Sequence, residues 1–235
     1  DRLLAIHPVP ASFDLTMRNA GALLTCGAPE GTALVLNRFS PARGDERRRW
    51  LMLRWQAAAA ALDHRQAALA LRRLVDGNVA ALDDITLAGP RNGLDTLAEH
   101  EASQGRPQSA ALVLLQGNLQ GAAGARRRGR AAEWLAATDP EQADQLLEVA
   151  LDEAASVQAW GLAMELLQLQ LRLQLAAGGD GERPRRRIER LAARLDDAYT
   201  QLQLNPESTP PPSLRSPREP GGHAAVGEPM TAPSL

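Results

Sequence analysis

Apolar side chains recur every three or four residues along most of the chain, the spacing that places them on one face of an α-helix. A segment from about Glu46 illustrates the pattern, with an apolar face that includes Trp50, Leu53, Ala57 and Ala61. Ala and Leu supply most of the apolar residues, and aromatic residues make up only 3% of the chain. Strong helix formers therefore dominate, and we predict an all-α fold.

One segment, Leu167–Leu175, alternates strictly between Leu and polar residues, as a β-strand does. Leu, Gln and Arg all favour helices, however, and the residues from Trp160 onward already repeat at helical spacing. We therefore predict a helix from about Val157 to Ala177 that has two apolar faces and lies between two neighbouring helices. These faces are Met164, Leu167, Leu171 and Leu175 on one side, and Leu166, Leu169 and Leu173 on the other.

Two segments are similar to each other at an offset of 78 residues, Gly27–Leu36 and Gly105–Leu114. Both fit Gly-x-Pro-Glu/Gln-x-x-Ala-Leu-Val-Leu. Glycine ends a helix in a left-handed conformation, and proline is favoured at the first position of the next helix. The repeated pattern therefore predicts two hairpins of antiparallel helices.

Two further helix pairs follow from weaker signals. A looser copy of the pattern spans Ala61–Leu71, in which Ala67 takes the place of the repeated alanine. A fourth pair opens at Asp139, a predicted N-cap with Pro140 at the first helical position and Gln142 three residues after the cap, and its first helix runs to about Ala155. We thus predict an α-solenoid of about four antiparallel pairs.

The end of the chain differs from the rest. After the break at Gly178–Gly181, we predict a final helix over Pro184–Leu204 that caps the stack. Residues 205–235 contain eight prolines and no apolar periodicity, so we predict a disordered tail. Pro210–Pro212 resembles a polyproline ligand, although such runs are mostly linkers. The predicted organisation is a helical-repeat domain over 1–204 and a proline-rich tail over 205–235.

The element Leu97–Ala110 resembles the tetratricopeptide repeat, in which a glycine such as Gly105 ends the first helix and an alanine five residues later, here Ala110, opens the packing face of the second. The similarity covers about residues 14 to 177 as four degenerate pairs. It implies stacked helical hairpins that bind other proteins. No binding residue of the family is carried over to this chain.

Composition excludes several kinds of chemistry. All 26 basic residues are Arg, so the chain has no lysine for a Walker-type phosphate loop or a Schiff base. The single cysteine, Cys26, permits neither an intrachain disulfide nor a multi-cysteine metal site, and we interpret it as a packed thiol. The four histidines, His7, His64, His100 and His223, are far apart in sequence and predict packing or surface roles.

Acidic pairs give no better candidate for catalysis. Neighbouring residues on a helix point in different directions, so Asp83–Asp84 and Asp196–Asp197 are interpreted as solvated charges. The chain also lacks a serine elbow of the Gly-x-Ser-x-Gly type. We therefore predict no catalytic residue, no metal site, no cofactor and no enzyme activity.

Three arginine clusters remain as candidates for binding an anionic ligand: Arg47–Arg49, Arg126–Arg130 and Arg183–Arg187. Such clusters bind phosphates when they line one face. The alternative is that the arginines are solvated and pair with neighbouring acidic residues such as Asp45, Glu133 and Glu189. We predict a possible anionic-ligand surface made of Arg126, Arg127, Arg128, Arg130, Arg185, Arg186 and Arg187. Trp50 and Trp134, which adjoin two of the clusters, are both expected in the core.

The functional expectation is a non-catalytic scaffold or adaptor that binds another protein through its helical repeats. The alternative is an arginine-mediated nucleic-acid or phosphate-binding protein, but the net charge of −2 makes nucleic acid the minor expectation. The longest uncharged stretch, Pro107–Ala125, is too polar for a membrane span. A cytoplasmic location is the default expectation, because no secretory signal is visible in the sequence given, which opens at Asp1 rather than at a methionine.

Overall fold

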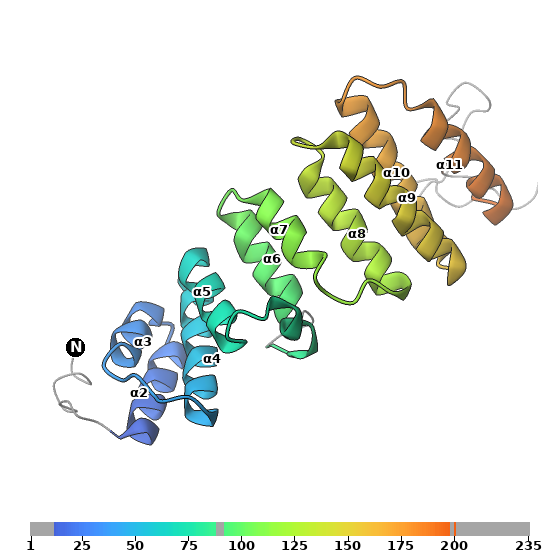
Figure 1. Ribbon diagram of the computed structural model, residues 1–235. Helices are drawn as coiled ribbons and strands as arrows, with labels where there is room; N and C mark the ends of the chain where they lie inside the picture. The colour runs from blue at the N-terminus through green and yellow to red at the C-terminus, as the bar shows by residue number, and fades with distance from the viewer. Residues whose placement is uncertain (1–11, 88–91, 198–199, 201–235) are drawn as a thin grey trace, which may run out of the picture. The chain divides into compact units, whose positions relative to one another are not determined.

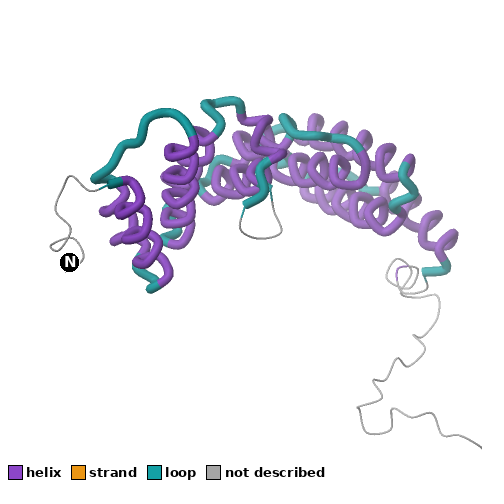
Figure 2. Tube along the Cα trace, turned by 90° about the horizontal axis from the view of Figure 1, so that it is seen from below, coloured by secondary structure: helices purple, strands orange, loops and turns teal. Residues whose placement is uncertain are grey.

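The computed structural model describes residues 12–87, 92–197 and 200. Within them lie ten α-helices (Figures 1 and 2) and one short 3-10 helix, and the strand-like pairing among these residues is a single bridge between Thr86 and Asn92. The helices are α2 (Phe13–Thr25), α3 (Pro29–Leu36), α4 (Asp45–Ala60), α5 (His64–Leu74), α6 (Gly93–Ser103), α7 (Pro107–Leu114), α8 (Gly121–Leu135), α9 (Pro140–Ser156), α10 (Trp160–Ala176) and α11 (Glu182–Leu195), with η1 (Val79–Asp84) before α6. The all-α prediction is confirmed.

The described residues divide into two compact units, one that ends at Pro184 and one that begins at Arg185. The first unit holds every helix from α2 to α10, and the second begins inside α11. Several sequence-based predictions lie outside the described residues: the proline-rich tail, the boundary at 204/205, and the roles of His7 and His223.

Each helix of the first unit packs mainly against its neighbours in the chain. Close pairs form between α2 and α3, α4 and α5, α6 and α7, and α9 and α10, and the closest packing among the described helices is between α8 and α9. Between these pairs, α3 contacts α4, α5 contacts α6, and α8 lies against both α7 and α9. This sequential packing confirms the predicted helical pairs, and the core is a series of small interfaces filled mostly by Ala and Leu.

The two similar segments adopt the same turn. Gly27 and Gly105 have φ angles of 71° and 72°, and α3 and α7, each of 8 residues, begin with a proline two positions later. In each turn the amide after the glycine donates to a carbonyl five residues earlier, at 2.9 Å from Ala28 to Leu23 and 3.2 Å from Arg106 to Glu101. Left-handed geometry at a helix C-terminus is what glycine accepts most readily. The predicted hairpins are therefore confirmed.

The same turn occurs twice more without glycine. Leu62 and Gln158 each have a φ of 56° and lie two residues before the first residue of α5 and of α10. Asp63 and Ala159 then donate across the turn to carbonyls five residues earlier, at 2.9 and 2.8 Å. Four helix pairs thus share one connection, although two of them carry a residue that this conformation strains.

This shared turn corrects the register of the looser copy. Counting from the left-handed residue, Ala68 rather than Ala67 corresponds to Ala33 and Ala111. The burial pattern agrees, because the next residue is exposed in each second helix and the two after it are buried. The exposed residues at this position are Leu34, Leu69, Leu112 and Glu165. The prediction at Ala67 was wrong by one residue because Leu62 gives no glycine signal.

Two other helices differ from expectation. The segment Gly121–Leu135 forms α8, which the sequence analysis did not identify as a helix. The helix predicted over Pro184–Leu204 is interrupted: α11 ends at Leu195, because Asp196 adopts a φ of 55° and the Asp197 amide donates back to the Ala192 carbonyl at 2.9 Å, and residues 201–204 lie outside the described ranges. By contrast, Leu167–Leu175 lies within α10, so the helix predicted there is confirmed.

Candidate functional site

A groove of about 580 Å³ crosses α6, α7 and α8 in the first unit. Its lining consists of Asp95, Glu99, Leu114, Ala123, Arg126, Arg127, Arg130 and Trp134. The acidic residues belong to α6, the basic residues and the tryptophan belong to α8, and Leu114 comes from α7. The groove therefore has an acidic wall and a basic wall, and part of its surface is apolar.

The basic wall follows one side of α8. Arg126, Arg130 and Trp134 are spaced four residues apart, which places them on the same side of a helix. The Arg130 guanidinium lies 4.9 Å from the centre of the Trp134 ring, a cation–π contact. It also contacts Glu133 at 3.2 Å and Glu99 at 3.5 Å. Arg130 is thus held in place and compensated by two carboxylates.

Arg126 differs from its neighbours. Its side chain is exposed, and within the described ranges it makes no hydrogen bond or ion pair. A guanidinium stays charged at all ordinary pH values. The groove therefore presents one positive charge that the described residues leave unpaired.

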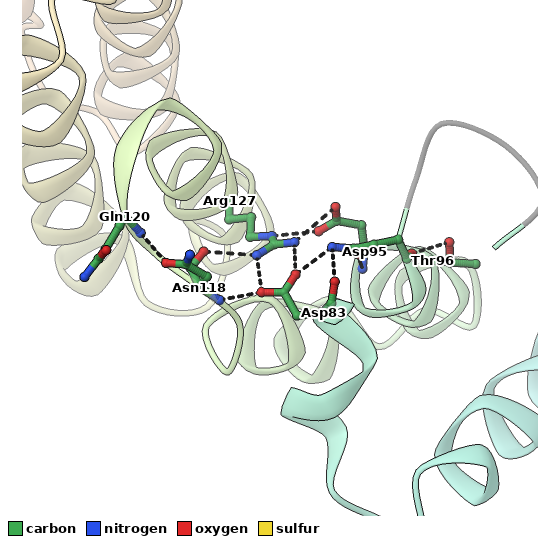
Figure 3. A network of polar contacts seen from close by, with 7 residues as sticks. Asp83, Asp95, Thr96, Asn118, Gln120 and Arg127 are labelled. Carbon is green, nitrogen blue, oxygen red and sulfur yellow. Dashed lines mark hydrogen bonds and ion pairs between the residues drawn. The ribbon is translucent and has the colours of Figure 1, made fainter. Parts of the chain in front are cut away.

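Arg127 lies at the base of this wall and holds two carboxylates (Figure 3). Its Nε donates to Asp95 Oδ1 at 2.9 Å, its Nη1 donates to Asp83 Oδ2 at 2.9 Å, and its Nη2 pairs with Asp83 Oδ1. The exposed fractions of the Arg127 and Asp83 side chains are 11% and 16%. This contact joins η1, α6 and α8, and we call it the Arg127 clamp.

Backbone groups complete the Arg127 clamp. Arg127 Nη1 donates to the Asn118 carbonyl at 3.0 Å, and the Asn118 amide donates to Asp83 Oδ2 at 2.6 Å. Asn92 donates from Nδ2 to Asp83 Oδ1 at 2.6 Å and accepts from the Asp95 amide at 2.9 Å, so it also caps α6. A Cβ on Gly117 would overlap Leu94 Cδ2 and come within 2.8 Å of Arg127 Nη1, so a larger residue there would displace these side chains.

The pKa shifts of Asp83 and Arg127 agree with these contacts. The hydrogen bond from Arg127 lowers the pKa of Asp83, against a raising effect of burial. Burial alone would lower the pKa of Arg127, but hydrogen bonds to Asp83 and Asp95 outweigh it and raise that pKa. Both groups are charged in the folded protein. Asp83 is therefore an ion-paired, largely buried residue, and its interpretation as a solvated charge was wrong.

The structure separates the predicted arginine surface into two sets. Arg126, Arg127, Arg128 and Arg130 all lie on α8, whereas Arg185, Arg186 and Arg187 lie on α11 in the second unit. Of the first set, Arg128 does not line the groove and donates instead to the Leu119 carbonyl.

Pairing with acidic neighbours also occurs elsewhere. Arg183 contacts Glu148 at 2.8 Å and Asp144 at 3.7 Å, two carboxylates on α9 that also accept hydrogen bonds from Gln170 on α10. The predicted pairing with local acidic residues holds for Arg130 and Glu133, but the partners of Arg127 and Arg183 come from distant parts of the sequence.

Two histidines that are distant in sequence meet between α5 and α6. The Nδ1 atoms of His64 and His100 lie 3.1 Å apart, and Trp55 Nε1 of α4 donates to His100 Nε2 at 3.1 Å. Gln104 supports them by donating to both of their backbone carbonyls, at 3.2 and 2.8 Å. His100 is 8% exposed, so the packing role predicted for it is confirmed.

The hydrogen bonds fix the protons of this pair. An indole N–H only donates, so His100 Nε2 must accept and the His100 proton must sit on Nδ1. That proton then points at His64 Nδ1, which accepts. Burial, with a smaller effect of His64 and an opposing one of Glu101, lowers the pKa of His100 to about 4. We call this arrangement the Trp55–His100–His64 chain, and it requires the His100 ring to be neutral.

Glu101, the neighbour of His100, is compensated separately. Its carboxylate is 3% exposed and pairs with Arg72 and Arg106, each at 2.9 Å. Arg72 belongs to α5, so this ion pair also joins the second and third helix pairs.

Other sequence-predicted features are placed as follows. Cys26 is exposed at the C-cap of α2, so its interpretation as a packed thiol was wrong. Trp50 is buried and donates to the Leu36 carbonyl at 3.0 Å, whereas Trp134 is only partly buried because it lines the groove.

Within the described ranges no cluster of three His, Cys, Asp or Glu side chains is arranged to hold a metal ion, and no helix there has the length and hydropathy to cross a membrane.

Comparison with protein-family models, with curated proteins and with solved structures found no match to this chain. The findings support an all-helical chain of sequentially packed pairs, and the resemblance to the tetratricopeptide repeat stays a prediction.

Proposed function

We propose that this chain is a non-catalytic scaffold that binds another protein, and that the groove across α6, α7 and α8 is where it does so. One observation carries the proposal: the groove exposes an arginine that the described residues leave unpaired, and a partly buried tryptophan, on a wall that the Arg127 clamp holds in position. Arginine and tryptophan are the residues most enriched at energetically important points of protein interfaces. A preorganised wall also lowers the entropy lost on binding.

The chemistry of the lining supports binding over catalysis. The eight lining residues include no serine, cysteine or histidine, the usual nucleophiles and general bases. Of its charged groups, Asp95, Glu99, Arg127 and Arg130 are engaged with one another. Such a lining orients a ligand by charge and contact.

The alternative function, binding of nucleic acid or a phosphate ligand through arginines, stays a prediction. The structure reduces the charge available for it on α8, because Arg127 and Arg130 are compensated by carboxylates. Continuous phosphate binding requires several uncompensated cations along the path of the backbone.

Affinity purification of the tagged full chain from its native host, with and without nuclease, tests the proposal. Three proteins are compared: wild type, Arg126→Glu in the groove, and the control Arg48→Glu, which alters an exposed arginine of α4. We expect one stoichiometric protein that resists nuclease and is lost with Arg126→Glu only. Recovery that collapses with nuclease, or the absence of any stoichiometric protein, contradicts the proposal.

A further inference from the structure

The charges of the groove determine which kind of partner segment it fits. Arg127 and Arg130 pair with four carboxylates, those of Asp83, Asp95, Glu99 and Glu133, so their two positive charges are more than compensated. Arg126 remains as the unpaired cation of the groove within the described ranges. A planar guanidinium binds a carboxylate through two parallel hydrogen bonds, so Arg126 is complementary to a single carboxylate.

The apolar part of the groove lies further along the same wall. Trp134 is two turns of α8 beyond Arg126, about 12 Å at the rise of an α-helix. An extended peptide covers that distance in about four residues. A segment whose carboxylate meets Arg126 therefore brings a side chain a few residues away against Trp134, where Arg130 already holds the ring by its cation–π contact.

The opposite wall argues against a polynucleotide. Asp95 and Glu99 on α6 are each about one-third exposed and face the groove. They therefore repel a nucleic-acid backbone, which carries a phosphate at every nucleotide. A peptide with one carboxylate avoids this repulsion by placing neutral residues beside the acidic wall. The volume of about 580 Å³ also falls in the range of sites that accept a small ligand or a few side chains.

From these observations we infer that the groove binds a short extended segment of a partner protein that carries one acidic residue, bound by Arg126, and an apolar residue two to four positions away, packed against Trp134. This inference rests on the proposed function and specifies the chemistry of the partner.

Selection from a phage-displayed library of random octapeptides on the immobilised full chain tests the inference. Wild type should enrich peptides that contain one acidic and one apolar residue two to four positions apart, in either order. The variant Arg126→Glu should lose these peptides and enrich basic ones, because the introduced carboxylate would join those of Asp95 and Glu99. The control Arg48→Glu should select as wild type does, and circular dichroism with urea unfolding verifies that all three proteins fold.

The affinity of a selected peptide then measures how much Arg126 contributes to binding. A selected peptide, labelled with fluorescein, should bind Arg126→Glu at least about tenfold more weakly than wild type in an anisotropy titration, as expected for the loss of a hydrogen-bonded ion pair. Replacing the acidic residue of the peptide by its amide should weaken binding to wild type by a similar factor and have little effect on Arg126→Glu.

Three results would overturn the inference: enrichment of basic or purely apolar peptides by wild type, equal selection by wild type and Arg126→Glu, or displacement of the labelled peptide at a lower concentration of octauridylate than of the unlabelled peptide. The last result would favour the phosphate-binding alternative. If acidic peptides are selected but host extracts yield no stoichiometric partner, the groove specificity stands and the scaffold function is what fails.

Discussion

At the scale of single residues, the geometry of the groove depends on Arg127. Its guanidinium satisfies two carboxylates that come from η1 and α6 and that are 44 and 32 residues away in sequence. Contacts between residues so far apart leave no pattern in the neighbouring sequence. The prediction therefore grouped Arg127 with its exposed neighbours. It therefore missed that Arg127 is structural, whereas the described residues leave Arg126 in the same cluster unpaired.

Replacing Arg127 by methionine should destabilise the protein by about 3 kcal/mol, because Asp83 and Asp95 lose their counter-charge in a largely buried place. The free energy of urea unfolding measures this loss. The control is Arg126→Met on the same helix, which removes an exposed guanidinium that the described residues leave unpaired and should change stability by less than about 0.5 kcal/mol. Equal effects of the two substitutions would show that the Arg127 clamp does not stabilise the fold.

The Trp55–His100–His64 chain predicts a pH dependence of stability. The pKa of His100 is lowered to about 4 in the folded protein, whereas an exposed histidine titrates near 6.5. Between these two pKa values the unfolded chain binds a proton on His100, whereas the folded chain keeps this ring neutral. The stabilisation is therefore complete above pH 6.5 and is lost as the pH falls toward 4, by about 2–3 kcal/mol in total.

Urea unfolding between pH 7 and pH 4 measures this slope. The variant His100→Gln keeps a polar side chain but removes the titrating ring, so its stability should fall less over the same range. The lowered pKa of Asp83 adds a loss that begins as the pH approaches the ordinary pKa of an aspartate, about 3.9, and grows below it. If wild type and His100→Gln lose stability in parallel, the buried neutral histidine is not the cause.

At the scale of elements, the sequence predicts what its turn residues determine. Gly27 and Gly105 revealed two hairpins because glycine followed by proline is a strong signal for the end of one helix and the start of the next. Leu62 and Gln158 form the same turn with residues that carry no such signal, so the register of one pair was displaced. Backbone hydrogen bonds across the turn, from Asp63 to Ala58 and from Ala159 to Ala154, hold this conformation, and such bonds carry no residue-type signal.

The unpredicted helix α8 has a similar explanation. Its N-cap, Gln120, makes no capping hydrogen bond from its side chain, and its first turns are rich in glycine. Glycine disfavours helices by roughly 1 kcal/mol relative to alanine, so the pattern looked like a loop. The structure shows why small residues are needed there: Gly124 lies against the backbone of Leu119.

Changing Gly124 to alanine should therefore destabilise the protein by about 2 kcal/mol, because the added methyl group overlaps the Leu119 backbone and forces α8 away from the preceding loop. The control is Gly161→Ala in α10, where nothing lies within 4 Å of the added Cβ. That change should stabilise the helix by up to about 1 kcal/mol. Thermal unfolding compares the two variants, and a gain in stability from Gly124→Ala would contradict the close approach.

Leu62→Gly should stabilise the protein by about 0.5–1 kcal/mol. Leu62 is 74% exposed, so little packing is lost, and glycine relieves the left-handed strain at a smaller entropic cost. The reverse change, Gly105→Leu, introduces that strain and should destabilise the protein. Chemical unfolding of both variants checks the pair, and opposite signs are expected.

At the scale of the whole molecule, the first unit is a series of helix pairs with small apolar contacts, and polar links join some neighbouring pairs. The Trp55–His100–His64 chain and the ion pairs of Glu101 connect the second pair to the third. The Arg127 clamp connects the third pair to α8. The groove forms where this clamp holds α6 and α8 together, so its position follows from the order of the helices.

Composition and patterning were sufficient to predict an all-α chain of paired helices, because helix formers and turn residues act locally. The location of the groove was not predictable, because it is made by α8, which had no clear helix signal, and by ion pairs between distant residues. The predicted surface over Arg126–Arg130 and Arg185–Arg187 contained three of the lining residues, and the structure adds the acidic wall and Trp134.

Photo-crosslinking from the groove tests the central claim most directly. A benzoylphenylalanine placed at Ala123, an exposed lining residue, should give one crosslinked protein in a nuclease-treated host extract, and a peptide with an acidic and an apolar residue should compete for it. The same amino acid at Leu34, an exposed position on α3, serves as control and should not give that product. The same adduct from both positions, or a nucleic-acid adduct from Ala123, would contradict a protein-binding groove across α6, α7 and α8.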